Sequence, residues 1–132
     1  MNRNLKNDLG RLGILAVYLF GSMFTGKTSP ASDIDLGIVF KDNFMPEHTK
    51  DMYIKLYKIF SEVYPSFIID IVFLQSAPLT LQYDAIRNGK VLFQAEPALR
   101  ADYEAKVISM YLDFKPVLKV FDDAASIRRA NV

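Results

Sequence analysis

The chain has 132 residues, of which 51% are hydrophobic and 23% are charged, and its net charge is +1. This length favours one domain with one core, and the composition is too apolar for a disordered chain. Without cysteine the chain has no disulfide, thiolate catalysis or cysteine-ligated metal, and the single His48 argues against a histidine-rich zinc site or a Ser-His-Asp triad. Metal or acid-base chemistry must therefore rest on carboxylates.

Charge and hydropathy disfavour membrane and nucleic-acid partners. The longest stretch without a charged residue, 12–26, is shorter than the roughly 20 apolar residues that a membrane-spanning helix needs. The N-terminal segment has no small-residue cleavage site after an apolar run, so we expect no secretory signal and a cytoplasmic protein. The near balance of 16 Lys and Arg with 15 Asp and Glu lacks the basic excess typical of stable nucleic-acid binding.

Strands and helices are predicted from the period of the apolar residues and from turn signals. In chain order they are a buried strand at 14–20, a loop at 25–32, a strand at 33–40, a helix at about 46–63, a strand at 67–74, a helix at 78–88, an edge strand at 90–94 and helices at about 97–129. Pro46 and Pro97 suit first helical turns, and Gly89 suits a left-handed helix cap. Pro116 is expected to break or kink the last helix.

This order of elements predicts an α+β or α/β fold in a single domain, 1–132, with a small β-sheet and helices on one side of it. The pattern does not decide whether neighbouring strands are parallel or antiparallel. We find no internal repeat and no linker long enough to separate two domains.

Three carboxylates interrupt the apolar strands. Asp33 and Asp35 are two residues apart and so share one face of their strand, while Asp70 lies on another strand that could pair beside it. Clustered acids repel one another, and Mg2+ takes oxygen ligands of this kind. The same spacing is equally consistent with a structural account, in which Asp33 caps a turn, Asp35 faces water and Asp70 lies at a solvated strand edge.

A small-residue bend follows the first strand. Gly21 and Ser22 allow the backbone to turn sharply and to direct N–H groups and a hydroxyl at a bound anion, as in a phosphate site. Lys27, in the following loop, could add a positive charge, although a solvated surface lysine is the simpler interpretation of that residue.

Together these residues form the pattern Gly-Ser-x10-Asp-x-Asp between two apolar strands, with a third acid in a later strand. This pattern resembles the signature of the DNA polymerase β-like nucleotidyltransferases over residues 14–40, and a looser likeness extends over nearly the whole chain. The short length and the stretches 89–93 and 111–116 look like the minimal nucleotidyltransferase antitoxins, which are paired with HEPN-domain toxins.

The resemblance implies the small mixed sheet of the polymerase β-like nucleotidyltransferase fold and the transfer of AMP from ATP to a hydroxyl. In the antitoxins, the resemblance implies that the acceptor is a tyrosine of the HEPN-type ribonuclease toxin, which is thereby neutralised. Gly21 and Ser22 would bind the nucleotide, with Lys27 as the nearest cation. The catalytic residues would be Asp33, Asp35 and Asp70, which together would hold two Mg2+ ions. Asp70 would also help to deprotonate the attacking hydroxyl.

Two other functions stay open at this point. The chain could transfer a nucleotide to a small-molecule hydroxyl, although a protein of this length has little chain left to enclose a substrate pocket. It could also be a non-catalytic antitoxin that masks the toxin by binding, and a last helix broken at Pro116 could leave apolar surface for such a partner.

Overall fold

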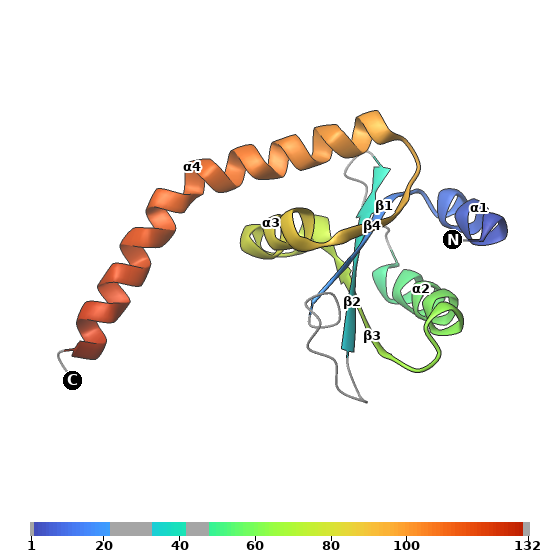
Figure 1. Cartoon of the computed structure of the whole chain (residues 1–132), viewed down its shortest axis with the longest axis horizontal. Helices are drawn as coiled ribbons and strands as arrows, with labels where there is room; N and C mark the ends of the chain where they lie inside the picture. Colours follow the sequence, from blue (N-terminus) through green and yellow to red (C-terminus); the bar gives the residue numbers. More distant parts are fainter. Residues whose placement is uncertain (1, 22–32, 42–47, 131–132) are drawn as a thin grey trace.

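A computed structural model describes residues 2–21, 33–41 and 48–130, with the side chains of the last helix described as far as residue 125. The elements, shown in Figure 1, are α1 (Arg3–Arg11), β1 (Ile14–Phe20), β2 (Asp33–Phe40), α2 (Thr49–Val63), β3 (Ile68–Phe73), the 3-10 turn η2 (Leu74–Ser76), α3 (Leu79–Asn88), β4 (Lys90–Gln94) and α4 (Pro97–Ala130). The four predicted strands are confirmed to within a residue at each end. The predicted first turn at Pro46 lies outside the described residues.

The strands form one mixed sheet in the order β3-β2-β1-β4. The pairs β1–β2 and β1–β4 are antiparallel, whereas β2 and β3 are parallel and are joined by a crossover through α2. The α+β class and the mixed sheet are therefore confirmed. Strand β1 lies inside the sheet, which explains why it is a continuous apolar run with every residue but Leu19 buried.

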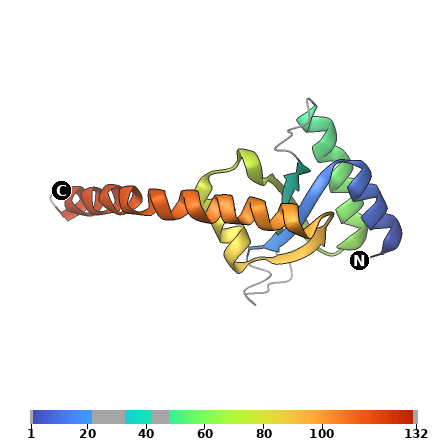
Figure 2. The ribbon, with the colours of Figure 1, turned by 90° about the horizontal axis from the view of Figure 1, so that it is seen from above.

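Helices cover both faces of the sheet, so the expectation of helices on one side is wrong (Figures 1 and 2). On one face, Leu9 of α1 and Phe60 of α2 pack against alternate residues of β2 such as Leu36. On the other face, Ala85 of α3 packs with Tyr18 of β1, and α4 adds partly buried residues. The physical reason is that β1 is apolar on both faces, and each face needs a cover.

Two local features differ from the sequence prediction. Helix α1 was not predicted, because it has few apolar residues; it is capped by Asn2, whose Oδ1 accepts a hydrogen bond from Asn4 N at 2.7 Å. Gly89 is extended (φ −84°, ψ 171°) and is not a left-handed cap. A glycine is required at this position because other backbone atoms approach it closely. A Cβ there would overlap the Ala85 carbonyl oxygen and lie 3.0 Å from the Leu19 carbonyl oxygen.

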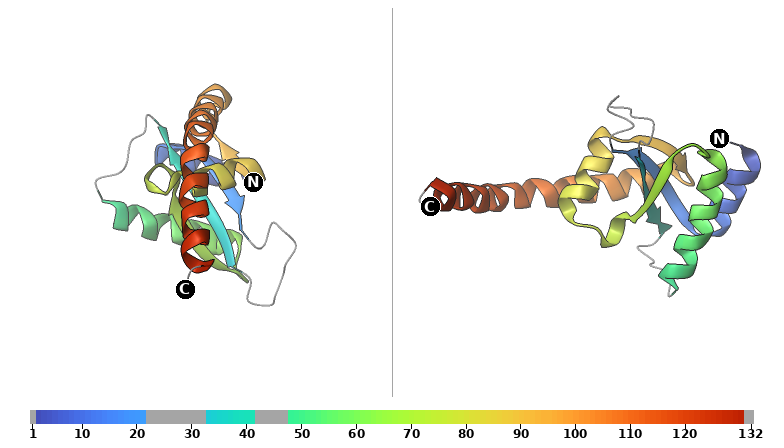
Figure 3. Two further views of the ribbon diagram at one scale, coloured as in Figure 1. Left: turned by 90° about the vertical axis from the view of Figure 1, so that its left-hand side faces the viewer. Right: turned by 90° about the horizontal axis from the view of Figure 1, so that it is seen from below.

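Helix α4 is continuous through Pro116, so of the two expected outcomes the break is wrong. The helix changes direction in its second half in Figure 1, which agrees with the expected kink. Its first turns pack on α3 and β1, and its distal half projects beyond the domain (Figures 2 and 3). Five large apolar side chains of this part of the helix are exposed: Leu112, Phe114, Val117, Val120 and Phe121. Within the described ranges, no helix is both long and apolar enough to span a membrane.

Candidate functional site

The parallel pairing of β2 and β3 brings the predicted acids together on one face of the sheet. Asp35 and Asp70 are direct partners in the ladder, and Asp33 is the partner of Ile68. The neighbouring Ile69 packs in the core beneath α2. Because side chains alternate along a strand, the three acids point to the opposite face, which α3 and α4 cover farther along the sheet.

Burial and like charge act on Asp35. Its side chain is half-buried, and two of its neighbours on the same face, Asp33 and Asp70, are acidic. Desolvation by burial raises the pKa of the Asp35 carboxyl, and the charges of Asp70 and Asp33 raise it further. An acid pair of this kind is a site where a cation relieves the repulsion.

Gly21 directly follows β1 and lies beside Asp35. It has φ +94°, a conformation that L side chains rarely adopt, and its strand neighbour Phe20 is the ladder partner of Asp35. A Cβ built at Gly21 would overlap Asp35 Oδ2. The absence of a side chain therefore lets the bend after β1 lie against the carboxylate. Ser22 and Lys27 lie outside the described residues, and their roles stay predictions.

The donor chemistry at this face fits Mg2+, although the described residues do not form a finished metal site. No group of three His, Cys, Asp or Glu side chains that could hold a metal ion occurs among them. Mg2+ is commonly bound by one or two carboxylates together with substrate phosphates, and Asp35 and Asp70 supply two adjacent oxygen donors. His48 is exposed.

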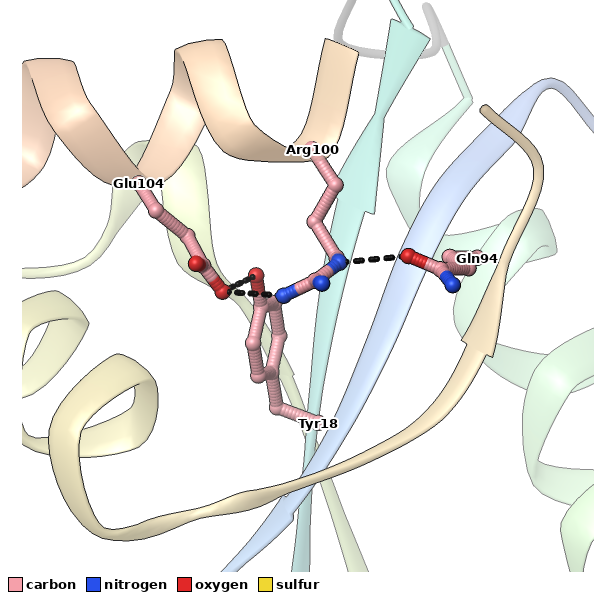
Figure 4. A network of polar contacts seen from close by, with 4 residues as sticks. All are labelled: Tyr18, Gln94, Arg100 and Glu104. Carbon is pink, nitrogen blue, oxygen red and sulfur yellow. Dashed lines mark hydrogen bonds and ion pairs between the residues drawn. The ribbon is translucent and has the colours of Figure 1, made fainter. Parts of the chain in front are cut away.

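A polar network that the sequence did not reveal joins β1 to α4 (Figure 4). The Tyr18 hydroxyl donates to Glu104 Oε1 at 2.8 Å, and Arg100 donates to the same oxygen at 2.6 Å and to Gln94 Oε1 at 2.6 Å. Burial is the main cause of the raised pKa of Tyr18, and the hydrogen bond to Glu104 adds to it. The network fixes α4 to the strand that leads into Gly21. The one sequence signal for this network is a tyrosine inside a buried strand, since a buried hydroxyl needs a hydrogen-bond partner.

The fold and the acid-bearing strands match a known family of enzymes. A family model described as "Polymerase beta, Nucleotidyltransferase" matches residues 4–98, which run from α1 through β4 into the start of α4. No curated protein matches the chain.

Solved structures of toxin-antitoxin complexes have a similar fold. A chain of a toxin-antitoxin crystallised with AMP-PNP superposes with a TM-score of 0.70 at 25% identity, covering 96% of this chain and 99% of that one. A chain of an MntA-HepT toxin-antitoxin has a TM-score of 0.63 at 21% identity, covering 95% and 99%. A chain from the complex of a tri-AMPylated Shewanella oneidensis HEPN toxin with MNT antitoxin has a TM-score of 0.64 at 22% identity. The match covers 96% of this chain and 99% of that one. The predicted polymerase β-like fold is therefore confirmed.

Proposed function

Since the chain belongs to the polymerase β nucleotidyltransferase family, we propose that it transfers AMP from ATP to a hydroxyl group with the help of Mg2+. The observation that carries this proposal is the pairing of Asp35 with Asp70 on one face of the sheet, with Gly21 against the Asp35 carboxylate. This arrangement supports a role in nucleotide transfer, because carboxylates that can bind a cation lie beside a bend that can direct N–H groups at phosphate.

Separate residues bind the nucleotide and the metal in this proposal. Gly21 and Ser22 bind the triphosphate, and Lys27 adds a positive charge to it. Asp33, Asp35 and Asp70 would hold the metal, with Asp35 and Asp70 as directly paired donors. Mg2+, when bound by these acids, neutralises the charge of the phosphates and of the leaving group.

The reaction proceeds beside Asp70, on the face of the sheet that carries the three acids. The acceptor oxygen forms a bond to the α-phosphorus of ATP, the bond from that phosphorus to the bridging oxygen breaks, and pyrophosphate leaves. Asp70, which is exposed on β3, accepts the proton of the acceptor hydroxyl at a carboxylate oxygen. Positioning and charge neutralisation supply most of the acceleration.

The acceptor that we propose is a tyrosine of a HEPN-type ribonuclease toxin, which AMP transfer neutralises. The similarity to a toxin-antitoxin crystallised with AMP-PNP supports both ATP as the nucleotide and a toxin as the partner. A complex with a similar chain, in which the HEPN toxin is tri-AMPylated, supports the direction of transfer. With ATP as the proposed substrate, we also propose the cytoplasmic location that the sequence predicts.

Intact-mass spectrometry tests this function. The purified chain, incubated with its HEPN partner, ATP and Mg2+, should add one or more AMP units to a partner tyrosine. Asp35→Asn should abolish the addition, whereas Asp51→Asn, an exposed acid on α2 at the opposite face, should leave it unchanged. Retention of full transfer by Asp35→Asn would contradict the proposal.

Two further measurements separate the other two functions. Neutralisation of the toxin at equal dose by the double variant Asp33→Asn, Asp35→Asn would favour masking by binding. The exposed apolar residues of distal α4 are the feature that favours this candidate. AMP transfer to a small hydroxyl compound without any protein partner would favour a small-molecule transferase.

A further inference from the structure

We propose that Ile68 determines acceptor specificity by contacting the group that carries the attacked hydroxyl. Ile68 is the first residue of β3, two residues before Asp70 and opposite Asp33 in the parallel ladder. This inference rests on the proposed transfer reaction and adds a substrate contact to it.

The side chain of Ile68 lies on the same face as the acids. Its neighbour Ile69 is buried in the core beneath α2, so alternation directs Ile68 and Asp70 to the other face. Ile68 is 57% exposed, the largest exposed fraction among the large apolar side chains of the sheet. The apolar core therefore does not account for an isoleucine at this position.

Strand order assigns Ile68 to the acceptor side of the site. Gly21, at the end of β1, lies on one side of β2, and β3 lies on the other side. A triphosphate held at the Gly21 bend therefore leaves the β3 side for the acceptor. In the described sheet β3 is an edge strand, so this side has no further strand to block a large acceptor.

The chemistry of Ile68 indicates what the acceptor offers. An exposed β-branched side chain beside carboxylates gains from covering an apolar surface and offers no hydrogen bond to a polar one. A phenolic acceptor provides such a surface directly next to its hydroxyl. We therefore expect Ile68 to contact the aromatic ring of the acceptor tyrosine.

Steady-state kinetics of AMP transfer, with toxin and ATP varied separately, test the contact. Ile68→Ala should raise the KM for the toxin by about tenfold, the scale of losing a few methyl groups from an apolar contact, while the KM for ATP stays unchanged. Ile68→Val should recover most of the loss. Ile54→Ala, an exposed isoleucine on α2 at the opposite face, is the matched control and should behave as wild type.

The outcomes distinguish the acceptor contact from the transfer reaction on which it rests. Wild-type kinetics for Ile68→Ala, or an equal rise in the KM for ATP, would overturn the acceptor contact while leaving the transfer reaction standing. Absence of any AMP transfer by the wild-type chain would overturn both. A melting temperature of Ile68→Ala close to wild type, expected for an exposed side chain, assigns the kinetic change to the contact.

Discussion

Asp35 and Asp70 face each other directly across the parallel strands β2 and β3. Like charges in directly paired positions destabilise a sheet. Desolvation and the repulsion from Asp70 and Asp33 together raise the pKa of Asp35 above its ordinary value of 3.8. The fold therefore carries a local electrostatic cost at the point where the proposed reaction needs a cation.

Asp35→Asn should raise the melting temperature of the metal-free protein at neutral pH. A carboxyl whose pKa is higher in the folded state is destabilising when ionised. This destabilisation is full above the raised folded pKa, and it fades as the pH falls through that pKa toward the ordinary value. Thermal melts across pH should therefore show the gain of the variant shrinking in acid. Asp51→Asn, on an exposed position of α2, should show no such gain.

Mg2+ should raise the melting temperature of the wild-type protein, because a ligand that binds only the folded state stabilises it by mass action. The expected shift is about 2.7 kcal/mol of unfolding free energy at a concentration a hundred times the dissociation constant. Asp35→Asn should lose most of this response. Calorimetry with Mg2+ and, separately, with K+ at matched ionic strength checks it; an equal response to both salts would point to general screening.

Gly21→Ala should abolish AMP transfer, and Gly13→Ala should not. Both glycines have positive φ, +94° and +78°, so each alanine should cost about 1–2 kcal/mol from backbone strain. Only at Gly21 does the new Cβ overlap Asp35 Oδ2; at Gly13 no atom lies within 4 Å. Urea melts and transfer assays on the two variants separate strain from damage to the site. Comparable transfer by both variants would show that the close approach is dispensable.

The sequence predicted the strands and the acids because both depend on short-range patterns. Alternation along 33–40 was enough to place Asp33 and Asp35 on one face, and the continuous run 14–20 correctly predicted a buried strand. The register that sets Asp35 opposite Asp70 depends on how the crossover through α2 returns the chain to the sheet. No local pattern contains that information.

Other features could not be predicted because they depend on tertiary contact. Two helical layers, α1 with α2 on one face and α3 with α4 on the other, form because both faces of the apolar sheet must be covered. The network around Glu104 joins Tyr18 to a residue 86 positions later, which local propensity does not report. The contact of Gly21 with Asp35 likewise becomes visible only when the ladder is formed.

Glu104→Ala should destabilise the fold more than Tyr18→Phe. Removing the carboxylate leaves the Tyr18 hydroxyl, in a residue that is 1% exposed, without its acceptor, and it deprives Arg100 of its ion pair. We expect a loss of about 1–3 kcal/mol for Glu104→Ala and about 1 kcal/mol for Tyr18→Phe. Urea unfolding measures both. Glu96→Ala, which removes a more exposed ion pair of 3.8 Å with Lys41, should change stability by less than about 0.5 kcal/mol.

Substitutions along α4 should affect stability only where the helix packs on the domain. Val107 is 1% exposed, and Val107→Ala should cost about 1–2 kcal/mol through lost burial and a small cavity. Phe121 is 67% exposed on the distal half of the helix, and Phe121→Ala should leave the melting temperature of the isolated chain unchanged. Melts at several protein concentrations provide the decisive comparison. A concentration-dependent fall for Phe121→Ala would show that a second copy of the chain covers this face, and a concentration-independent fall would show that Phe121 packs within its own chain.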